Sequence, residues 1–187
     1  STKSGIVAAI KNHPKRKRFV AFHPMWGTEN SGPKSAQRES FSGRAAVICD
    51  KEDSAEDAFS LVEKVAKTLE MNTIFMASEA HDVHTAYISH ISHITSYALA
   101  NTVLEKEREE DTIFQLASSG FSSTVRLAKS HPEMWVPIFK QNKENVLDVL
   151  NEHITQLRKF KAALEKENYE LLEELIRNAN KIRGILK

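Results

Sequence analysis

Four of the chain's eight histidines lie in one stretch, residues 79–99, which reads EAHDVHTAYISHISHITSYAL. Imidazoles three residues apart are a spacing that metal sites use, and an imidazole beside a carboxylate can serve as a general base. At about 100° of rotation per residue, a helix here would carry several polar groups on one face. That face holds Asp82, Ala86, Ser89, His93 and Tyr97, with His90 at its edge and with His81 and His84 pointing elsewhere.

Three interpretations of these histidines stay open. A metal site would use His81 with His84, or His90 with His93, but zinc usually takes a third or fourth protein ligand and no cysteine lies nearby, so we predict no metal. The histidines could instead be satisfied or exposed groups on an interface helix. In the third interpretation, Ser89 and His93 hydrogen-bond a polar ligand, because buried polar groups need partners.

A second stretch, FVAFHPMWGTENSGP at residues 19–33, carries His23 directly after an apolar run and Glu29 six positions later. Open α/β sheets bind ligands beyond the carboxyl ends of their strands. An imidazole titrates near neutral pH, which suits a general base. The spacing therefore favours His23 as a base at a strand end, with a loop histidine that caps a turn as the alternative.

Composition restricts the class of protein. The chain has 187 residues with 26 Lys and Arg against 25 Asp and Glu, a net charge of +1, which is not the basic bias typical of nucleic-acid binders. No run approaches the roughly 18 apolar residues of a membrane span. The single cysteine, Cys49, can form no internal disulfide, and no signal peptide is visible, so we expect a cytoplasmic location.

The pattern of apolar residues predicts a mostly helical α+β chain. Short apolar runs indicate three strands, and a capping-box pattern of Ser54 with Asp57 predicts the start of a helix that ends near Glu70. After residue 77 the strand signal stops, which marks a domain boundary. The strands are 19–22, 45–49 and 73–77, and the later helices are 78–106, short pieces in 111–130, 133–165 after Pro132, and 167–185.

Four segments together resemble the prephenate dehydrogenase (TyrA) family, and they occur in the family's order. STK at residues 1–3 resembles its Gly-Ser-x-Lys segment, and the loop at 19–33 resembles its HPM.G.E.SG loop. HDVHTAYISHISHITSYAL at 81–99 resembles its HD...SH..H...AL helix. SSGFSSTVRLAKSHPEMW at 118–135 resembles its GF...R.A.S.P.MW segment, although relatives often carry a glycine-rich turn where this chain has Ser118 and Ser119.

The resemblance implies a fold of two parts. Residues 1–77 would be the C-terminal remnant of a Rossmann-type nucleotide-binding domain, and residues 78–187 a helical substrate-binding and dimerisation domain. Family members carry out the NAD- or NADP-dependent oxidative decarboxylation of prephenate or arogenate in tyrosine biosynthesis. Because no G-x-G-x-x-G occurs in the chain, the resemblance also implies that the main cofactor contacts are missing and that this chain alone is inactive.

The resemblance also implies roles for individual residues. His23 would be the catalytic base, and Ser1 would hydrogen-bond the same substrate hydroxyl. Arg126 would hold the ring carboxylate, with Glu29 as its partner at the entrance. The remaining site residues would be Ser89, His93 and Ser119, with Asp82 and His90 in support. Trp135 resembles a tryptophan that the family supplies from the neighbouring subunit, and a core tryptophan at the start of a helix is the alternative.

The resemblance implies a homodimer with prephenate or arogenate as substrate and tyrosine as an inhibitor, and neither nucleic acid nor a membrane as a partner. The alternative is a non-catalytic helical dimer that binds a small aromatic ligand such as tyrosine. An apolar surplus on the C-terminal helices favours a dimer in either case.

Overall fold

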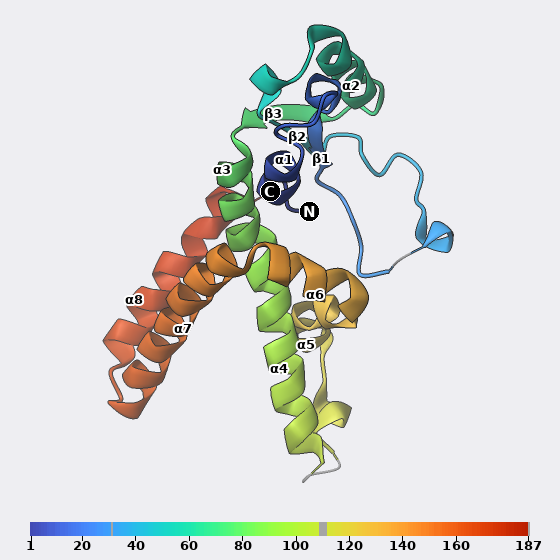
Figure 1. Cartoon of the computed structure of the whole chain (residues 1–187). Helices are drawn as coiled ribbons and strands as arrows, with labels where there is room; N and C mark the ends of the chain where they lie inside the picture. The colour runs from blue at the N-terminus through green and yellow to red at the C-terminus, as the bar shows by residue number, and fades with distance from the viewer. Residues whose placement is uncertain (31, 109–111, 187) are drawn as a thin grey trace. The chain divides into compact units, whose positions relative to one another are not determined.

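The computed structural model describes residues 1–30, 32–108 and 112–186 (Figure 1). The chain separates into two compact units, Ser1–Val146 and Leu147–Lys187. The first unit holds a small sheet with the helices around it, and the second holds most of α7 (Lys143–Glu165) together with α8 (Tyr169–Asn180). The predicted mostly helical α+β class is confirmed.

The sheet contains β1 (Ala21–Pro24), β2 (Ala45–Cys49) and β3 (Asn72–Met76), in the order β1-β2-β3. Strand β2 has the predicted bounds, because AAVIC is one continuous apolar run. β3 runs parallel to β2, whereas β1 runs antiparallel to it, with His23 opposite Val47.

The direction of β1 corrects the sequence-based placement of His23. His23 is the third residue of β1 and not the first residue of a loop, and the carboxyl end of β1 lies at the amino end of β2. The rule for parallel sheets, which assumes that all carboxyl ends meet at one edge, does not apply to this strand. Another element therefore has to bring the remaining site residues to His23.

Alternation along β2 supplies apolar side chains to both faces of the sheet. On one face, Val47 and Cys49 pack with Val7 of α1 (Ser4–Ala9). On the other face, Ala46 packs with Ala66 of α2 (Glu56–Thr68). The sheet thus lies between two helices, in keeping with an α/β layer arrangement.

The predicted start of α2 is one residue too early. The N-cap position is Ala55, which has no capping side chain. Ser54 Oγ donates instead to the carbonyl oxygen of Phe19 at 2.9 Å, and Asp57 pairs with Arg18. Both polar groups therefore bind the segment before β1, a contact that the local capping pattern does not reveal.

The predicted helix 78–106 forms as a nearly continuous run that contains one irregular turn. α3 (Ser78–Thr85) is followed by a π-helical turn (Ala86–His90) and then by α4 (Ile91–Glu107). Figure 1 shows α3 leading from β3 into α4. A π-turn adds one residue to the helical repeat, so the residues before and after it do not share the faces that an uninterrupted α-helix would give them.

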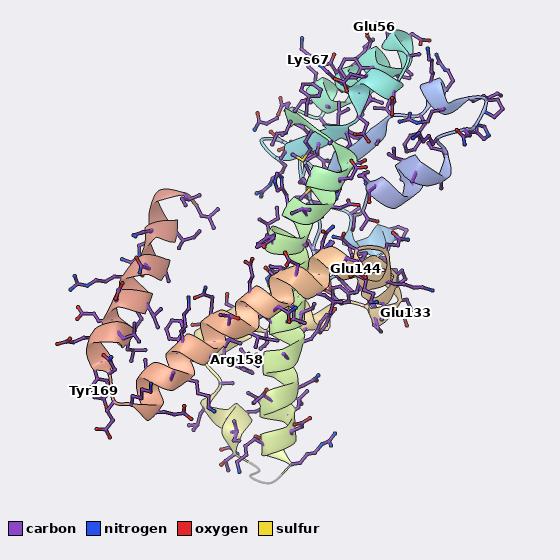
Figure 2. All side chains as sticks on the ribbon, turned by 60° about the vertical axis from the view of Figure 1, so that its left-hand side comes forward. Glu56, Lys67, Glu133, Glu144, Arg158 and Tyr169 are labelled. Atoms are coloured by element: carbon purple, nitrogen blue, oxygen red, sulfur yellow. The ribbon has the colours of Figure 1, made fainter. Side chains whose placement is uncertain are left out.

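The predicted helix 133–165 is divided in two. α6 (Pro132–Gln141) begins with Pro132 in its first turn, as predicted, and ends at Asn142, whose φ of −112° departs from helical geometry. α7 then begins at Lys143. Figure 2 shows Glu144 and Arg158 along α7 and Tyr169 at the start of α8. The other helical segments are α5 (Ser119–Thr124) and short 3-10 turns at Arg16–Arg18, Pro33–Ser35, Lys51–Asp53, Ile113–Leu116, Arg126–Lys129 and Lys181–Gly184.

In the described part of the chain, no helix is both long enough and apolar enough to cross a membrane.

Candidate active site

The first unit contains a cavity of about 560 Å³ at the point where β1, the π-turn and α6 approach one another. Its wall combines imidazole, hydroxyl, guanidinium and indole groups with small and apolar side chains. Among its lining residues are Ser1, His23, Thr85, Ser89, His90, His93, Arg126, Met134 and Trp135. These side chains come from five separate stretches of the sequence, so the cavity forms only when the unit folds.

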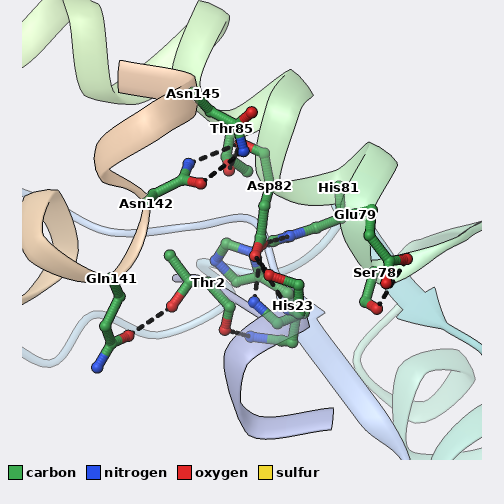
Figure 3. A network of polar contacts seen from close by, with 12 residues as sticks. Thr2, His23, Ser78, Glu79, His81, Asp82, Thr85, Gln141, Asn142 and Asn145 are labelled. Carbon is green, nitrogen blue, oxygen red and sulfur yellow. Dashed lines mark hydrogen bonds and ion pairs between the residues drawn. The ribbon is translucent and has the colours of Figure 1, made fainter. Parts of the chain in front are cut away.

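His23 is held from behind by two residues of α3. Its Nδ1 lies 2.7 Å from His81 Nε2, and His81 Nδ1 lies 2.8 Å from Asp82 Oδ1. His81 and Asp82 are each only 1% exposed, whereas His23 is half-buried and lines the cavity. Figure 3 shows the three side chains in this order. A carboxylate and two imidazoles therefore form one hydrogen-bonded row that ends at the cavity.

Asp82 is at the same time the anchor of α1. Its Oδ1 accepts a hydrogen bond from Lys3 N at 2.8 Å, and its Oδ2 accepts one from Ser4 N at 2.9 Å and another from Ser4 Oγ. Burial alone would raise the pKa of Asp82, but the hydrogen bonds from His81, Ser4 and Lys3 outweigh it and lower that pKa to about 2. Asp82 is therefore a carboxylate, and every group that contacts it must donate.

The environment of His23 favours its neutral form. Burial, followed by the positive charge of Lys3, lowers the pKa of His23 to about 3, although Asp82 opposes the shift. A neutral imidazole retains one unprotonated ring nitrogen and can accept a proton from a ligand.

His90 is held by Asn142, the residue that separates α6 from α7. Asn142 Nδ2 lies 2.7 Å from the carbonyl oxygen of Asp82 and 3.2 Å from His90 Nδ1. Burial lowers the pKa of His90 to about 4, so the ring is neutral near pH 7. Because an amide nitrogen only donates, His90 Nδ1 is the acceptor and the ring proton is on Nε2.

His93 forms an aromatic wall of the cavity together with Trp135. Their ring centroids are 3.4 Å apart with an interplanar angle of 27°, a stacked arrangement. His93 Nδ1 donates to the carbonyl oxygen of Ser89 at 3.0 Å, and burial lowers the pKa of His93. Trp135 is 6% exposed, and its indole Nε1 has no hydrogen-bond partner among the described residues. A ligand oxygen in the cavity would supply the missing acceptor.

Arg126 supplies the positive charge of the cavity. Its Nη1 lies 2.6 Å from Glu29 Oε2, and the two side chains are 51% and 21% exposed. A hydrogen bond from the Glu29 backbone and the contact with Arg126 lower the pKa of Glu29. The guanidinium has five donors, so donors remain for a second carboxylate while this ion pair is in place.

Most of the residues predicted from the sequence meet in this cavity. Glu29 reaches it through Arg126, whereas Asp82 lies behind His23 and away from the lining. Ser119 is exposed at the start of α5 and is not among the lining residues. Trp135 lines the cavity of its own chain, and its supply to the site of a neighbouring subunit stays a prediction. The predicted residues in the lining are Ser1, His23, Ser89, His90, His93, Arg126 and Trp135.

Two residues of the arrangement, His81 and Asn142, were not predicted from the sequence. Helix periodicity directs His81 away from the polar face, and it places Asn142 inside a continuous helix. A signal was available in both cases. His81 and Asp82 are adjacent polar residues shortly after a strand, and Asn142 lies between two helical runs. Both patterns are typical of buried polar contacts.

In the described residues, no three or more His, Cys, Asp or Glu side chains gather in a way that could hold a metal ion. Asp82, His81 and His23 lie in one row, but their ring nitrogens and carboxylate oxygen are joined to one another by hydrogen bonds. The arrangement suits acid–base chemistry and the binding of an anionic ligand.

The same chain is similar to solved structures of known proteins. Prephenate dehydrogenase from A. aeolicus, solved in complex with hydroxyphenyl propionate and NAD+, superposes with a TM-score of 0.89 at 29% identity, over 100% of this chain and 65% of that one. Synechocystis arogenate dehydrogenase superposes with a TM-score of 0.78 at 22% identity, over 100% of this chain and 67% of that one, which shows a shared fold.

Curated relatives agree with this result. Prephenate dehydrogenase of Bacillus subtilis (strain 168) is 29% identical over 98% of this chain and 50% of its own length. Cyclohexadienyl dehydrogenase of Zymomonas mobilis is 26% identical over 100% of this chain and 64% of its own length. The chain thus spans between half and two thirds of the length of these relatives.

Two family models match successive parts of the chain. Residues 1–75 match the nucleotide-binding domain of prephenate dehydrogenase, and residues 77–178 match its dimerization domain. Together they cover both the sheet that carries His23 and the helices that carry the rest of the cavity, and on this basis the chain belongs to the prephenate dehydrogenase family.

Proposed function

We propose that this chain carries the substrate side of a prephenate or arogenate dehydrogenase. One observation carries the proposal: His23, Ser89, His93 and Arg126, from separate segments, line a single cavity in a chain that both family models match. A ring hydroxyl would meet the imidazole of His23, and a ring carboxylate would meet the guanidinium of Arg126.

His23 would accept the proton of the ring hydroxyl. The O–H bond breaks, and the new N–H bond forms on the imidazole nitrogen that His81 does not occupy. In the ligand-free cavity the pKa of His23 is lowered to about 3, first by burial and then by Lys3. A substrate with two carboxylates brings negative charge close to the ring and raises this pKa toward neutrality, which favours proton transfer.

Arg126 and Trp135 would hold the carboxylates of the substrate. A guanidinium binds a carboxylate with two parallel hydrogen bonds, and each charge-assisted hydrogen bond contributes about 1.5–3 kcal/mol. Among the described residues, Trp135 Nε1 is a buried donor without a hydrogen-bond partner, and a ligand oxygen would satisfy it. Ser1 and Ser89 add hydroxyl groups that can donate or accept.

The family reaction also needs a nicotinamide dinucleotide as hydride acceptor. This chain's six glycines contain no G-x-G-x-x-G spacing, and within the described residues nothing beside Gly5, Gly27 or Gly32 forms a tight backbone cradle. The residues present do not fit the pyrophosphate of such a cofactor, and we assign it no step on them.

The two parts of the family architecture would divide near residue 77, and the helical part would form a homodimer. The match of residues 77–178 to a dimerization domain supports this assembly. The helices in that range also expose large apolar side chains, including Leu104, Leu157, Leu164 and Ile176, each about half exposed. Sedimentation of the chain as a monomer at high concentration would contradict it.

Calorimetric titration of the chain with prephenate and with hydroxyphenyl propionate tests the proposal. Replacing Arg126 by Ala should lower affinity about ten- to a hundredfold, because one charge-assisted contact is worth about 1.5–3 kcal/mol. Lys129→Ala is the matched control, since it removes an exposed positive charge from the same turn outside the cavity lining. Equal losses in the two variants, or no binding by the unsubstituted chain, would overturn the assignment.

A further inference from the structure

The buried pair of His81 and Asp82 contacts the proposed base and lies outside the cavity lining. The order of hydrogen bonds in this row determines where each proton sits. Asp82 Oδ1 is a carboxylate oxygen and can only accept, so His81 Nδ1 donates to it. His81 Nε2 is then the ring nitrogen that is left to accept a hydrogen bond from His23.

The acceptor nitrogen of His81 in turn determines which ring nitrogen of His23 carries the proton. Since His81 Nε2 accepts, His23 Nδ1 carries the proton of the 2.7 Å contact between them. The other ring nitrogen of His23, Nε2, is then unprotonated. A carboxylate that orients a histidine and fixes its tautomer is a known arrangement in proteases, where the wrong tautomer lowers turnover about 10⁴-fold.

We propose that His81 and Asp82 are positioning residues that hold His23 as its Nδ1–H tautomer and leave Nε2 as the proton acceptor of the cavity. This inference rests on the proposed function for the identity of the proton donor, a substrate hydroxyl. When Nε2 takes that proton, an N–H bond forms as the O–H bond breaks. The positive charge on His23 is then stabilised by the acceptor His81 and, behind it, by the carboxylate of Asp82.

The residues around Asp82 and His81 keep the hydrogen bonds of this row in place. Asp82 is bound by Lys3 N, Ser4 N and Ser4 Oγ from the start of α1, so its carboxylate cannot rotate away from His81. At 1% exposure, neither His81 nor Asp82 can exchange its partner for bulk water. α1 thus contributes to the site indirectly, by fixing the carboxylate.

Long-range ¹H–¹⁵N NMR correlation of the histidine side chains measures this tautomer directly in the full chain near neutral pH. The His23 signals are assigned by their disappearance in His23→Gln. In the unsubstituted chain we expect His23 Nδ1 to show the shift of a protonated nitrogen and Nε2 that of an unprotonated one. The opposite pattern overturns the proposal without any variant at His81.

His81→Phe then tests the cause, because phenylalanine keeps the ring shape and removes the acceptor. We expect His23 to shift toward the Nε2–H tautomer in this variant. His84→Phe, at an exposed position of the same helix, is the matched control and should leave the His23 signals unchanged. An unchanged tautomer in His81→Phe would overturn the proposal, and if that variant does not fold, the measurement on the unsubstituted chain decides.

The tautomer experiment uses neither substrate nor turnover, so it separates this inference from the proposed function. The expected tautomer in a chain that fails to bind prephenate would refute the function and retain the role of His81 in setting His23. Prephenate binding with His23 as the Nε2–H tautomer would retain the function and refute the role of His81 in setting the His23 tautomer.

Discussion

Replacing Asn142 by Ala should destabilise the first unit and release His90. Asn142 is 4% exposed and donates through Nδ2 to the carbonyl oxygen of Asp82 and to His90 Nδ1. Its Oδ1 accepts from Asn145 Nδ2 at 2.8 Å. One amide therefore joins the end of α6 to the helical run that carries His81, Asp82 and His90.

The expected loss can be worked out from these contacts. The carbonyl of Asp82 keeps a second donor, Thr85 Oγ1 at 3.2 Å, so losing the bond from Asn142 costs about 1 kcal/mol. His90 Nδ1 belongs to a ring that is 1% exposed, and it would be left as a buried acceptor without a partner, at about 1–3 kcal/mol. The free energy of unfolding should therefore fall by about 2–4 kcal/mol.

Urea denaturation followed by tryptophan fluorescence measures this loss, because Trp26 and Trp135 both lie in the first unit. The ring centroids of His90 and Trp135 are 5.9 Å apart, so the signal reports on the affected region. Asn145→Ala is the matched control: its side chain is half-buried, and its removal should cost about one net hydrogen bond, about 1 kcal/mol. If the two variants lost the same stability, the bridging role of Asn142 would be refuted.

Two further predictions concern the charges of the cavity. Because burial lowers the pKa values of His23 to about 3 and His90 to about 4, the unfolded chain binds more protons than the folded chain below about pH 6.5. Stability should be complete above that pH and fall as the pH decreases toward 4, by about 1.4 kcal/mol per pH unit for each histidine. Urea titrations of His90→Gln should therefore show a shallower dependence of stability on pH than those of the unsubstituted chain. Glu29→Gln should raise affinity for hydroxyphenyl propionate up to about fivefold, because it frees Arg126 from an exposed ion pair of about 1 kcal/mol. A gain of equal size in an Arg126→Ala background would contradict that cause.

Local patterns predicted the elements of the fold well. β2 is a continuous apolar run, and α6 starts with a proline in its first turn, so both follow from a few adjacent residues. The direction of β1 does not, since an apolar run of four residues pairs equally well in either direction, and the choice depends on the rest of the unit. That is why His23 was predicted at a strand end and lies within a strand.

The site was predictable where a residue's role depends on its chemical type. A histidine after a strand suggested a base, and a Ser–His pair on a helix suggested a face for a polar ligand. The family resemblance added Arg126 as the anion site, and these groups do meet. The contacts behind His23 depend on residues far apart in the sequence. Asp82, for example, binds Ser4 at the start of α1, 78 positions earlier. Helix periodicity compares only neighbours within a few turns, so it could not assign Asp82 to α1 or His81 to His23.

The π-turn explains why one helix can serve both sides of His23. In an uninterrupted α-helix, Asp82 and His93 are eleven residues apart and fall within about 20° of the same face. The extra residue between Ala86 and His90 removes about 100° of rotation, so the two residues point in different directions. His81, bound to Asp82, can then contact His23 from behind, while Ser89 and His93 line the cavity. A straight helix would direct the carboxylate into the cavity, where it would repel an anionic substrate.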